Sequence, residues 1–341
     1  MIQIKNNKAI LVRREKAEEV RMHLIQNNLL DRSRKMRISS NLNFVEVPVL
    51  REVDGYDLIH QKNPEYYFKF RNLKERLEEI VAPDQLKYVP SGWQVIGKVI
   101  VITIPENIAS LKPVIGEELL KMYPSCSCVV NDKGIKGKLR QPAREIIAGD
   151  VTETVHRENG CVFKLDVTKV MYSKGNLYEK KYMRKLGTGE TIVDMFAGIG
   201  YFTIPIAVHA RPEKIYAIEL NSESYSYLLE NIRLNRVEDI VEPILGDCME
   251  KTPKAVADRV LMGYIGNTHE YLETAISALK REGGIIHYHE SVPEKIFPER
   301  PISRIMEAAS NKGKMVKILE YRRIKKYSPG VWHAVIDARI E

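Results

Sequence analysis

The clearest pattern of hydrophobic and polar positions begins at Thr191, where short apolar runs alternate with segments of helical periodicity. The helical segments cover residues 201–210, 222–234 and 268–281, and each follows an apolar run. Strands that alternate with helices in this way are typical of a mostly parallel sheet. Residues 315–340 have the pattern of a final hairpin, which we expect at the edge of that sheet. The second half of the chain is therefore predicted to be an α/β domain.

The first half of the chain has a less regular pattern of short strands and helices. A helix is expected over residues 13–28 because apolar residues recur there at helical spacing, and a strand over 44–49, where polar and apolar residues alternate. Residues 93–104 give the strongest strand signal of this half, with Gly97 marking a bulge or a hairpin. The stretch 131–144 combines two glycines, a proline and five cations, and we predict a basic loop. The predicted domains are a small N-terminal domain, an α+β middle domain and the α/β domain, with boundaries at 1–85, 86–175 and 176–341.

The charge of the chain is concentrated in its first half. Lys and Arg number 53 and Asp and Glu 45, a net charge of +8. Residues 1–180 hold 30 basic and 23 acidic residues, a net of +7, whereas residues 181–341 hold 23 and 22, a net of +1. Such an asymmetry suggests an anionic partner, with nucleic acid as the first candidate, and a merely soluble basic surface as the alternative.

The composition is that of an ordinary globular protein, with 44% hydrophobic and 29% charged residues. No apolar run approaches the ~20 residues that span a bilayer, and the first residues lack the apolar core of a signal peptide. Four cysteines in 341 residues form no disulfide framework. We therefore expect a cytoplasmic protein without membrane association.

A glycine-rich turn follows the first strand of the α/β pattern. Gly198 and Gly200 allow the backbone to approach a ligand closely, and the third glycine of a dinucleotide fingerprint is absent. Asp194 lies inside this motif, where it would repel a pyrophosphate and attract an ammonium group. Glu219 ends the second strand, where it is placed to bind ribose hydroxyls, and Asp247 follows the third, where it could meet an adenine amine. This arrangement fits S-adenosylmethionine better than NAD; the alternative is a glycine turn with capping acids and no ligand.

Histidines and aromatic residues supply further candidates. His287 and His289 alternate, so both face one side of a strand; zinc would need a third ligand that is not evident, and no metal site is predicted. A histidine that faces the substrate is favoured because ligands bind at the carboxyl ends of such strands. Phe196 and Tyr264 are candidates for stacking on adenine or on a substrate base, with ordinary core packing as the alternative.

Specific motifs in this half carry a resemblance to a known family. The segments DMFAGIGYFTIP and IYAIELN, together with residues 156–183, resemble tRNA methyltransferases that modify the purine 3′ of the anticodon. The same segments resemble the related wyosine-pathway tRNA 3-amino-3-carboxypropyltransferases. The resemblance covers roughly residues 90–341, and the first 90 residues are only loosely similar to the N-terminal domain of the methyltransferase branch. It implies a Rossmann-like, S-adenosylmethionine-dependent transferase fold with a mostly parallel seven-stranded sheet.

The two branches of this family differ after the fourth strand. The guanine methyltransferase branch has an Asn-x-Pro form there, whereas this chain has Met262-Gly263-Tyr264-Ile265-Gly266. The glycine-tyrosine form resembles the aminocarboxypropyl branch, which implies transfer to 4-demethylwyosine at position 37 of tRNA-Phe with release of methylthioadenosine. Two alternatives stay open: guanine-N1 (or wyosine-precursor) methyl transfer at the same position, favoured by the N-terminal segment and Glu179, and a tRNA-binding protein that has lost catalysis.

The resemblance also implies roles for individual residues. Ser173 and Lys180 are expected beside the methionine part of the cofactor, although the family usually has Arg at the second position. Glu179 matches a catalytic acid of the methyltransferase branch, with helix pairing or solvent exposure as the alternative. Glu179 and His289 are thus the catalytic candidates. The cofactor-binding residues are predicted to be Ser173, Lys180, Asp194, Phe196, Gly198, Gly200, Tyr201, Phe202, Glu219, Leu220, Asp247, Cys248 and Tyr264.

Basic segments are the candidates for contact with tRNA. Residues 131–144 are favoured because their glycines leave the backbone able to follow phosphates, and the runs 32–37 and 322–326 are further candidates. No obligate protein partner is evident, and a monomer is expected. The predicted tRNA-binding residues are Lys133, Lys136, Lys138, Arg140 and Arg144.

Overall fold

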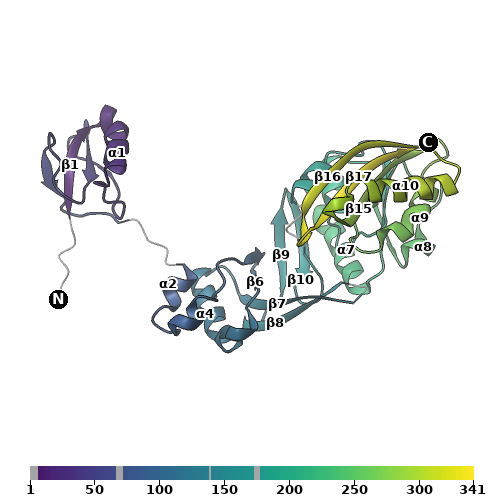
Figure 1. Ribbon diagram of the computed structural model, residues 1–341, viewed down its shortest axis with the longest axis horizontal. Coiled ribbons are helices and arrows are strands. Elements are labelled where there is room, and N and C mark those ends of the chain that lie inside the picture. Colours follow the sequence, from purple (N-terminus) through teal and green to yellow (C-terminus); the bar gives the residue numbers. More distant parts are fainter. Residues whose placement is uncertain (1–6, 67–71, 138–139, 173–176) are drawn as a thin grey trace. The chain divides into compact units, whose positions relative to one another are not determined.

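The structure is a computed structural model that describes residues 7–66, 72–137, 140–172 and 177–341 (Figure 1). Contacts divide the chain into two compact units, residues 1–75 and 76–341. The three-part division at residues 85 and 175 stays a prediction. None of the described helices has the length and hydropathy of a membrane-spanning helix.

The first unit is a small antiparallel sheet packed against one helix. The sheet has the order β2-β3-β1-β4. Val20 and Leu24 of the helix pack on Ile10 and Val47 of the two central strands, as the helical spacing predicted. The elements are β1 (Lys8–Arg13), α1 (Ala17–Gln26), β2 (Arg37–Ile38), β3 (Phe44–Pro48) and β4 (Leu58–His60).

The second unit begins with a four-stranded sheet of order β5-β6-β7-β8, followed by a two-stranded ribbon, β9 and β10. Gly97, at a φ of +56°, turns the chain between the first two strands, so the predicted strand 93–104 is a hairpin. The elements are α2 (Leu73–Leu77), α3 (Pro83–Leu86), β5 (Gln94–Ile96), β6 (Val99–Ile102), α4 (Lys112–Met122), β7 (Cys128–Lys136), β8 (Gln141–Gly149), β9 (Glu153–Glu158) and β10 (Cys161–Asp166).

The prediction of a basic loop over 131–144 is wrong. Most of this stretch belongs to the antiparallel hairpin of β7 and β8, in which Ile135 pairs with Pro142 and Lys136 with Gln141. The end of this hairpin is exposed on both faces, so its sequence lacks the alternation that identifies a half-buried strand. A bulge between Asp132 and Ile135 interrupts the pattern further.

The rest of the second unit is the predicted Rossmann-like domain. Its seven-stranded sheet has the order β13-β12-β11-β14-β15-β17-β16, and the predicted final hairpin, β16 with β17, forms one edge. The first five of these strands are parallel, and β17 and β16 are antiparallel to their neighbours. The strands are β11 (Thr191–Asp194), β12 (Lys214–Glu219), β13 (Val241–Leu245), β14 (Arg259–Met262), β15 (Gly284–Pro293), β16 (Val316–Ser328) and β17 (Val331–Ile340).

Helices cover both faces of this sheet (Figure 1). Ile192 and Leu261 pack with α6 and α7 in one hydrophobic cluster, whereas their neighbours Val193 and Val260 pack with α9 and α10 in the other. Successive side chains of a strand point to opposite faces, so this sheet buries both. The helices are α5 (Leu177–Met183), α6 (Thr203–His209), α7 (Ser222–Asn235), α8 (Cys248–Lys251), α9 (Leu272–Ala278) and α10 (Glu299–Asn311).

The two units should unfold as separate bodies. Leu24→Ala and Leu261→Ala each remove a buried side chain, one from each unit, at an expected cost of about 2–5 kcal/mol. Both tryptophans, Trp93 and Trp332, lie in the second unit, so tryptophan fluorescence reports on that unit alone. In urea unfolding we expect L261A to lower the fluorescence midpoint and L24A to leave it unchanged. Equal shifts of this midpoint in both variants would show that the units unfold together.

Candidate active site

The glycine-rich turn lies between β11 and α6 at the carboxyl edge of the sheet. Gly198 and Gly200 have φ values of +58° and +98°, in the left-handed region that favours glycine. A Cβ atom at Gly198 would collide with the Tyr201 ring, and one at Gly200 would lie 2.5 Å from the Ile204 side chain. The turn thus depends on glycine at both positions, because the Tyr201 ring and the Ile204 side chain occupy the space that a side chain would take.

Asp194 ends β11 beneath this turn. Its carboxylate accepts hydrogen bonds from the backbone N–H of Phe196 at 3.2 Å and from the hydroxyl of Thr203 at 2.8 Å. The side chain is buried and forms no ion pair among the described residues, and burial raises its pKa to about 6. Asp194 therefore holds the turn through these hydrogen bonds, and a cation beside its buried carboxylate would stabilise the charged form.

Glu219 ends β12 beside the turn. One of its carboxylate oxygens accepts the backbone N–H of Gly198 at 2.7 Å, and the other accepts that of Asn221 at 2.8 Å. Burial raises its pKa, and the next residue, Leu220, is exposed. These two hydrogen bonds hold the carboxylate against the glycine-rich turn.

Asp247 follows β13 and caps α8, where its side chain accepts the backbone N–H of Met249 at 2.9 Å. Cys248 is buried behind it, and burial raises the pKa of its thiol to about 12. The predicted set of three acids is thus brought to the carboxyl ends of three neighbouring strands. Their roles toward a cofactor stay predictions.

Aromatic side chains form the next part of the site. Phe196 stacks on Tyr264 with ring centroids 5.3 Å apart, and the ring of Tyr271 meets Phe196 edge-on at 5.2 Å. Tyr271 was missed by the sequence analysis, because its position in a short helical turn gives no periodic signal. A Cβ atom at Gly263 would lie 2.9 Å from the buried ring of Phe202, so glycine allows this ring to cover the tip of β14.

Lys180 lies in a buried position on α5. Its ammonium group donates to Glu158 at 3.0 Å and stands 4.3 Å from the ring centroid of Tyr172 and 5.7 Å from that of Tyr201. Burial lowers its pKa, although Glu158 opposes this effect. Ser173, predicted to lie beside Lys180, falls outside the described residues.

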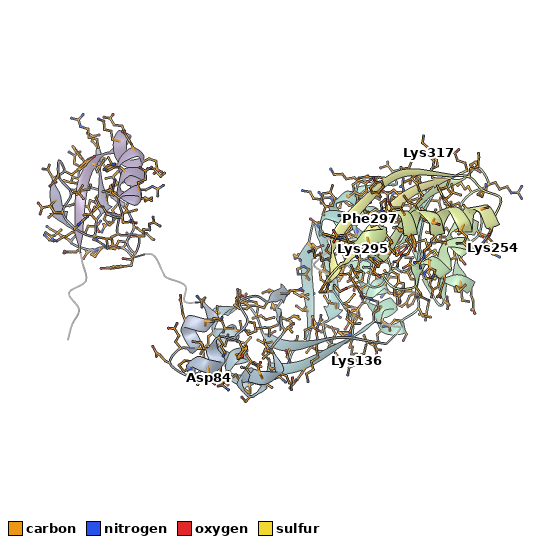
Figure 2. The ribbon with its side chains drawn as sticks, in the orientation of Figure 1. Asp84, Lys136, Lys254, Lys295, Phe297 and Lys317 are labelled. Atoms are coloured by element: carbon orange, nitrogen blue, oxygen red, sulfur yellow. The ribbon has the colours of Figure 1, made fainter. Side chains whose placement is uncertain are left out.

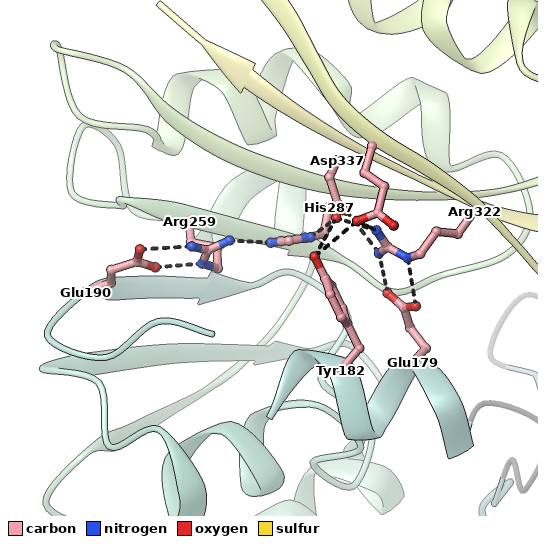
Figure 3. A network of polar contacts seen from close by, with 8 residues as sticks. Glu179, Tyr182, Glu190, Arg259, His287, Arg322 and Asp337 are labelled. Atoms are coloured by element: carbon pink, nitrogen blue, oxygen red, sulfur yellow. Dashed lines mark hydrogen bonds and ion pairs between the residues drawn. The ribbon is translucent and has the colours of Figure 1, made fainter. Parts of the chain in front are cut away.

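Glu179, the next residue on α5, belongs to a different set of contacts (Figure 3). Its two carboxylate oxygens accept from the guanidinium group of Arg322 on β16, at 2.9 and 3.3 Å. Arg322 also donates to Asp337 on β17 at 2.6 Å. The prediction of a catalytic role for Glu179 stays open; in this structure its carboxylate is fully buried and held by the ion pair with Arg322.

The network continues across the sheet (Figure 3). His287 contacts Asp337 through Nδ1 at 2.7 Å and Arg259 through Nε2 at 2.6 Å. Because arginine is a donor, Nε2 must accept, and the ring proton lies on Nδ1 toward Asp337. Arg259 in turn pairs with Glu190 at 2.6 and 2.9 Å, and Tyr182 lies 3.4 Å from Asp337. His287 is therefore hydrogen-bonded within the sheet, and the histidine predicted to be catalytic is the other one, His289.

His289 lies on the same face of β15 as His287, as the alternation predicted. Its Nδ1 atom is 3.0 Å from Nε2 of His333 on β17, and its ring centroid is 5.5 Å from that of Phe202. Burial lowers the pKa of His289 well below its usual range, so its imidazole is neutral. The described part of the chain holds no group of three or more His, Cys, Asp or Glu side chains arranged to bind a metal ion.

The predicted tRNA-binding residues of the β7–β8 hairpin differ in exposure. Lys136 is exposed, as Figure 2 shows, and Lys133 pairs with Glu145 at 2.8 Å. Arg144 differs from Lys136, because its side chain is 5% exposed and donates to the carbonyl of Val167; its contact with tRNA stays a prediction. Lys138 falls outside the described residues.

Arg140 reaches from the end of this hairpin to the tip of β14. It donates to the carbonyl oxygen of Ile265 at 3.1 Å, and its guanidinium carbon is 6.0 Å from the ring centroid of Tyr264. The middle region of the chain therefore contributes a cation to the edge of the predicted cofactor site.

Comparison with known proteins identifies the family. A tRNA(Phe) (4-demethylwyosine(37)-C(7)) aminocarboxypropyltransferase of Methanocaldococcus jannaschii is 48% identical over 225 residues, which cover 66% of this chain and 90% of the relative. The enzyme of the same name from Pyrococcus horikoshii is 38% identical and covers 79% of this chain and 98% of the relative. The chain belongs to the TRM5/TYW2 family.

Profiles of TRM5/TYW2 families match three successive segments. The TRM5/TYW2 methyltransferase domain matches residues 154–319, the TYW2 N-terminal domain residues 73–152, and the tRNA methyltransferase 5 N-terminal domain residues 9–57. The chain thus joins an N-terminal segment typical of one branch of the TRM5/TYW2 family to a middle segment typical of the other.

Solved structures of TRM5/TYW2 proteins have the same fold. Trm5b of Pyrococcus abyssi is 34% identical, with a TM-score of 0.79 over 98% of this chain and 99% of that structure. TYW2 of P. horikoshii in complex with MeSAdo is 37% identical, with a TM-score of 0.70 over 79% of this chain and 97% of that structure.

The buried carboxyl of Asp194 predicts a pH effect on stability. Between pH 4 and 6 the folded protein keeps a proton here that the unfolded chain has lost, so rising pH destabilises the fold at this site. We expect the free energy of unfolding of the wild type, relative to Asp194→Asn, to fall by on the order of 3 kcal/mol from pH 4 to pH 7. Urea unfolding measures it, with the exposed Asp239→Asn as control. A constant difference between wild type and D194N would contradict this account of Asp194.

Proposed function

We propose that this chain transfers the 3-amino-3-carboxypropyl group of S-adenosylmethionine to 4-demethylwyosine at position 37 of tRNA-Phe. The tip of β14 carries this proposal. Gly263 lies against Phe202, and a Cβ atom at Gly266 would meet the Tyr264 ring at 2.7 Å, so backbone and aromatic rings fill the place of an Asn-x-Pro motif. Asn267, the next amide side chain, donates to Glu270 and is not directed to a substrate nitrogen.

The residues at the carboxyl edge fit this cofactor. The backbone of the turn at Gly198 would border the methionine part, and the partly accessible carboxylate of Glu219 would accept from the ribose hydroxyls. Asp247 and the aromatic residues at 196 and 264 would border the adenine. S-adenosylmethionine supplies an electrophilic γ-carbon beside a sulfonium leaving group.

The chain's own residues would orient the base, exclude water and receive a proton. Tyr264 offers a stacking surface, and Phe202 closes the tip of β14. His289 is the favoured acceptor for the proton that leaves the base, because its neutral imidazole has a free lone pair; its lowered pKa makes it a weak base, so positioning must supply most of the catalysis. We assign Glu179 a positioning role, since its ion pair with Arg322 holds α5 against the edge hairpin.

The tRNA partner is supported by charge and by a relative. In a solved complex of aTrm5 with tRNALeu, the protein is 28% identical to this chain, with a TM-score of 0.76 over 98% of this chain. The first 180 residues carry most of the net positive charge, including the exposed Lys136. Contact with tRNA is therefore assigned mainly to this part of the chain.

Methyl transfer is the second candidate, and one observation favours it. Trm5b of P. abyssi matches 97% of this chain, including the N-terminal unit, whereas the TYW2 enzyme of P. horikoshii matches 79%. The two reactions leave different nucleosides from the same cofactor, so the by-product separates them.

Incubation with S-adenosylmethionine and precursor tRNA should release methylthioadenosine, identified by mass spectrometry. S-adenosylhomocysteine, formed with this tRNA or with tRNA that carries guanine at position 37, would instead establish methyl transfer. Tight binding of both tRNAs without either product would establish a binding protein. Unmodified tRNA with guanine at position 37 is the control, since the proposed enzyme should not turn over with it.

Glu219→Gln should weaken the binding of S-adenosylmethionine and methylthioadenosine alike by about 10–100-fold, because one charge-assisted acceptor is lost. The affinity for tRNA should not change. Glu223→Gln, at an exposed carboxylate on α7, is the matched control. Calorimetry measures the three affinities, and wild-type cofactor binding by E219Q would refute the assignment of Glu219.

A further inference from the structure

A group of basic side chains lies beyond the tip of β14. Strand β14 ends at Met262, opposite Tyr288, while β15 continues to Pro293 and stays paired with β17. Beyond the end of β14, the neighbouring strands supply two of these side chains: His333 on β17 lies opposite Lys325 on β16. Arg140 comes to the same place from the β7–β8 hairpin through its hydrogen bond to Ile265.

In the part of the chain that the structure describes, no acidic side chain compensates the charge of this group. Among the described residues, neither Arg140 nor Lys325 forms an ion pair with an acidic side chain, and Lys325 is half-buried. Burial and the neighbouring Arg140 lower the pKa of Lys325. Burial, Lys325 and Arg140 lower the pKa of His333 to about 3. The two cations are therefore close enough to oppose each other and to keep the histidine neutral.

Two buried cations elsewhere in this unit form ion pairs, in contrast to Arg140 and Lys325. Arg322, on the same strand as Lys325, is held by Glu179 and Asp337, and Lys180 is held by Glu158. An unpaired cation in such surroundings is costly unless a ligand supplies the opposite charge.

The histidine pair gives an independent sign of a missing partner. His333 is 0% exposed, and its Nδ1 atom has no hydrogen-bond partner. When His289 donates its Nδ1 proton to Nε2 of His333, the proton of the neutral His333 ring lies on Nδ1. A buried donor without an acceptor is unfavourable, and an oxyanion would satisfy it.

We propose that Arg140 and Lys325, backed by His333, form an oxyanion site at the tip of β14. Two oxyanions of the proposed reaction would reach this place: the carboxylate of the cofactor's amino-acid arm and the phosphate of the target nucleotide. The identity of these two anions rests on the proposed function, whereas the need for an anion rests on the charges alone.

The test compares ligands with and without each anion. Lys325→Gln and Arg140→Gln are the variants, and Lys317→Gln is the matched control, because this lysine lies on the same strand as Lys325, is exposed and belongs to none of the basic segments considered for tRNA contact. Calorimetry gives the affinity of each for S-adenosylmethionine, for methylthioadenosine, which lacks the amino-acid arm, and for tRNA.

If the anion is the carboxylate, both variants lose about tenfold or more in affinity for S-adenosylmethionine and keep wild-type affinity for methylthioadenosine. If the anion is the phosphate, cofactor affinity is unchanged, tRNA binds at least about tenfold more weakly, and the salt dependence of tRNA binding falls by about one ion per lost charge. Lys325→Arg should restore the affinity in either case, which separates loss of charge from misfolding.

Wild-type affinity of both variants for all three ligands would overturn the proposal. This outcome differs from a failure of the proposed function, which the by-product of the wild-type protein decides. A protein that releases S-adenosylhomocysteine could still have the oxyanion site, and one that releases methylthioadenosine could lack it.

Discussion

Burial of both faces of the seven-stranded sheet is the constraint on which the site depends. Neighbouring residues of β11 and β14 enter different hydrophobic clusters, because helices cover each face. Polar side chains on these strands must therefore either pair within the sheet or stand at its carboxyl ends. Asp194, Glu219 and Asp247 stand at the carboxyl ends, and each accepts a hydrogen bond from a backbone N–H group of the segment that follows its strand. Acids that shape the ends of the strands thereby present an acidic edge to a cationic ligand.

At the antiparallel edge of the sheet, polar side chains instead pair with one another within the sheet. Arg322, Asp337 and His287 come from three adjacent strands and neutralise one another inside the domain. Burying charges in this way is tolerated only when every partner is present. The same network reaches α5 through Glu179, so the helix that carries Lys180 is held by the edge hairpin. A residue that the resemblance marks as catalytic is, by this geometry, part of what positions the site.

The sequence predicted features that depend on local pattern. Strand ends at Asp194 and Glu219, the edge hairpin and the two glycines of the turn follow from periodicity and from backbone geometry. The pairing of Glu179 with Arg322 joins residues 143 positions apart, and no local signal contains it. The β7–β8 hairpin was missed because both its faces are exposed beyond Asp132, so no hydrophobic alternation marks it. The burial of Arg144 has no local signal either, because it comes from contact with Val167 of a later segment.

The charge asymmetry of the chain takes a different meaning in three dimensions. The division into a basic first half and a near-neutral second half suggested one part for tRNA and another for the cofactor. Arg140 belongs to the basic half, yet it donates a hydrogen bond to the carbonyl of Ile265 at the tip of β14, and its charge lowers the pKa of Lys325. If tRNA binds this hairpin as proposed, its phosphates would act on the charge of Arg140 at the place where the reaction is proposed to occur. Binding of tRNA and organisation of the site would then be coupled through Arg140 and Ile265, which lie 125 positions apart in the sequence.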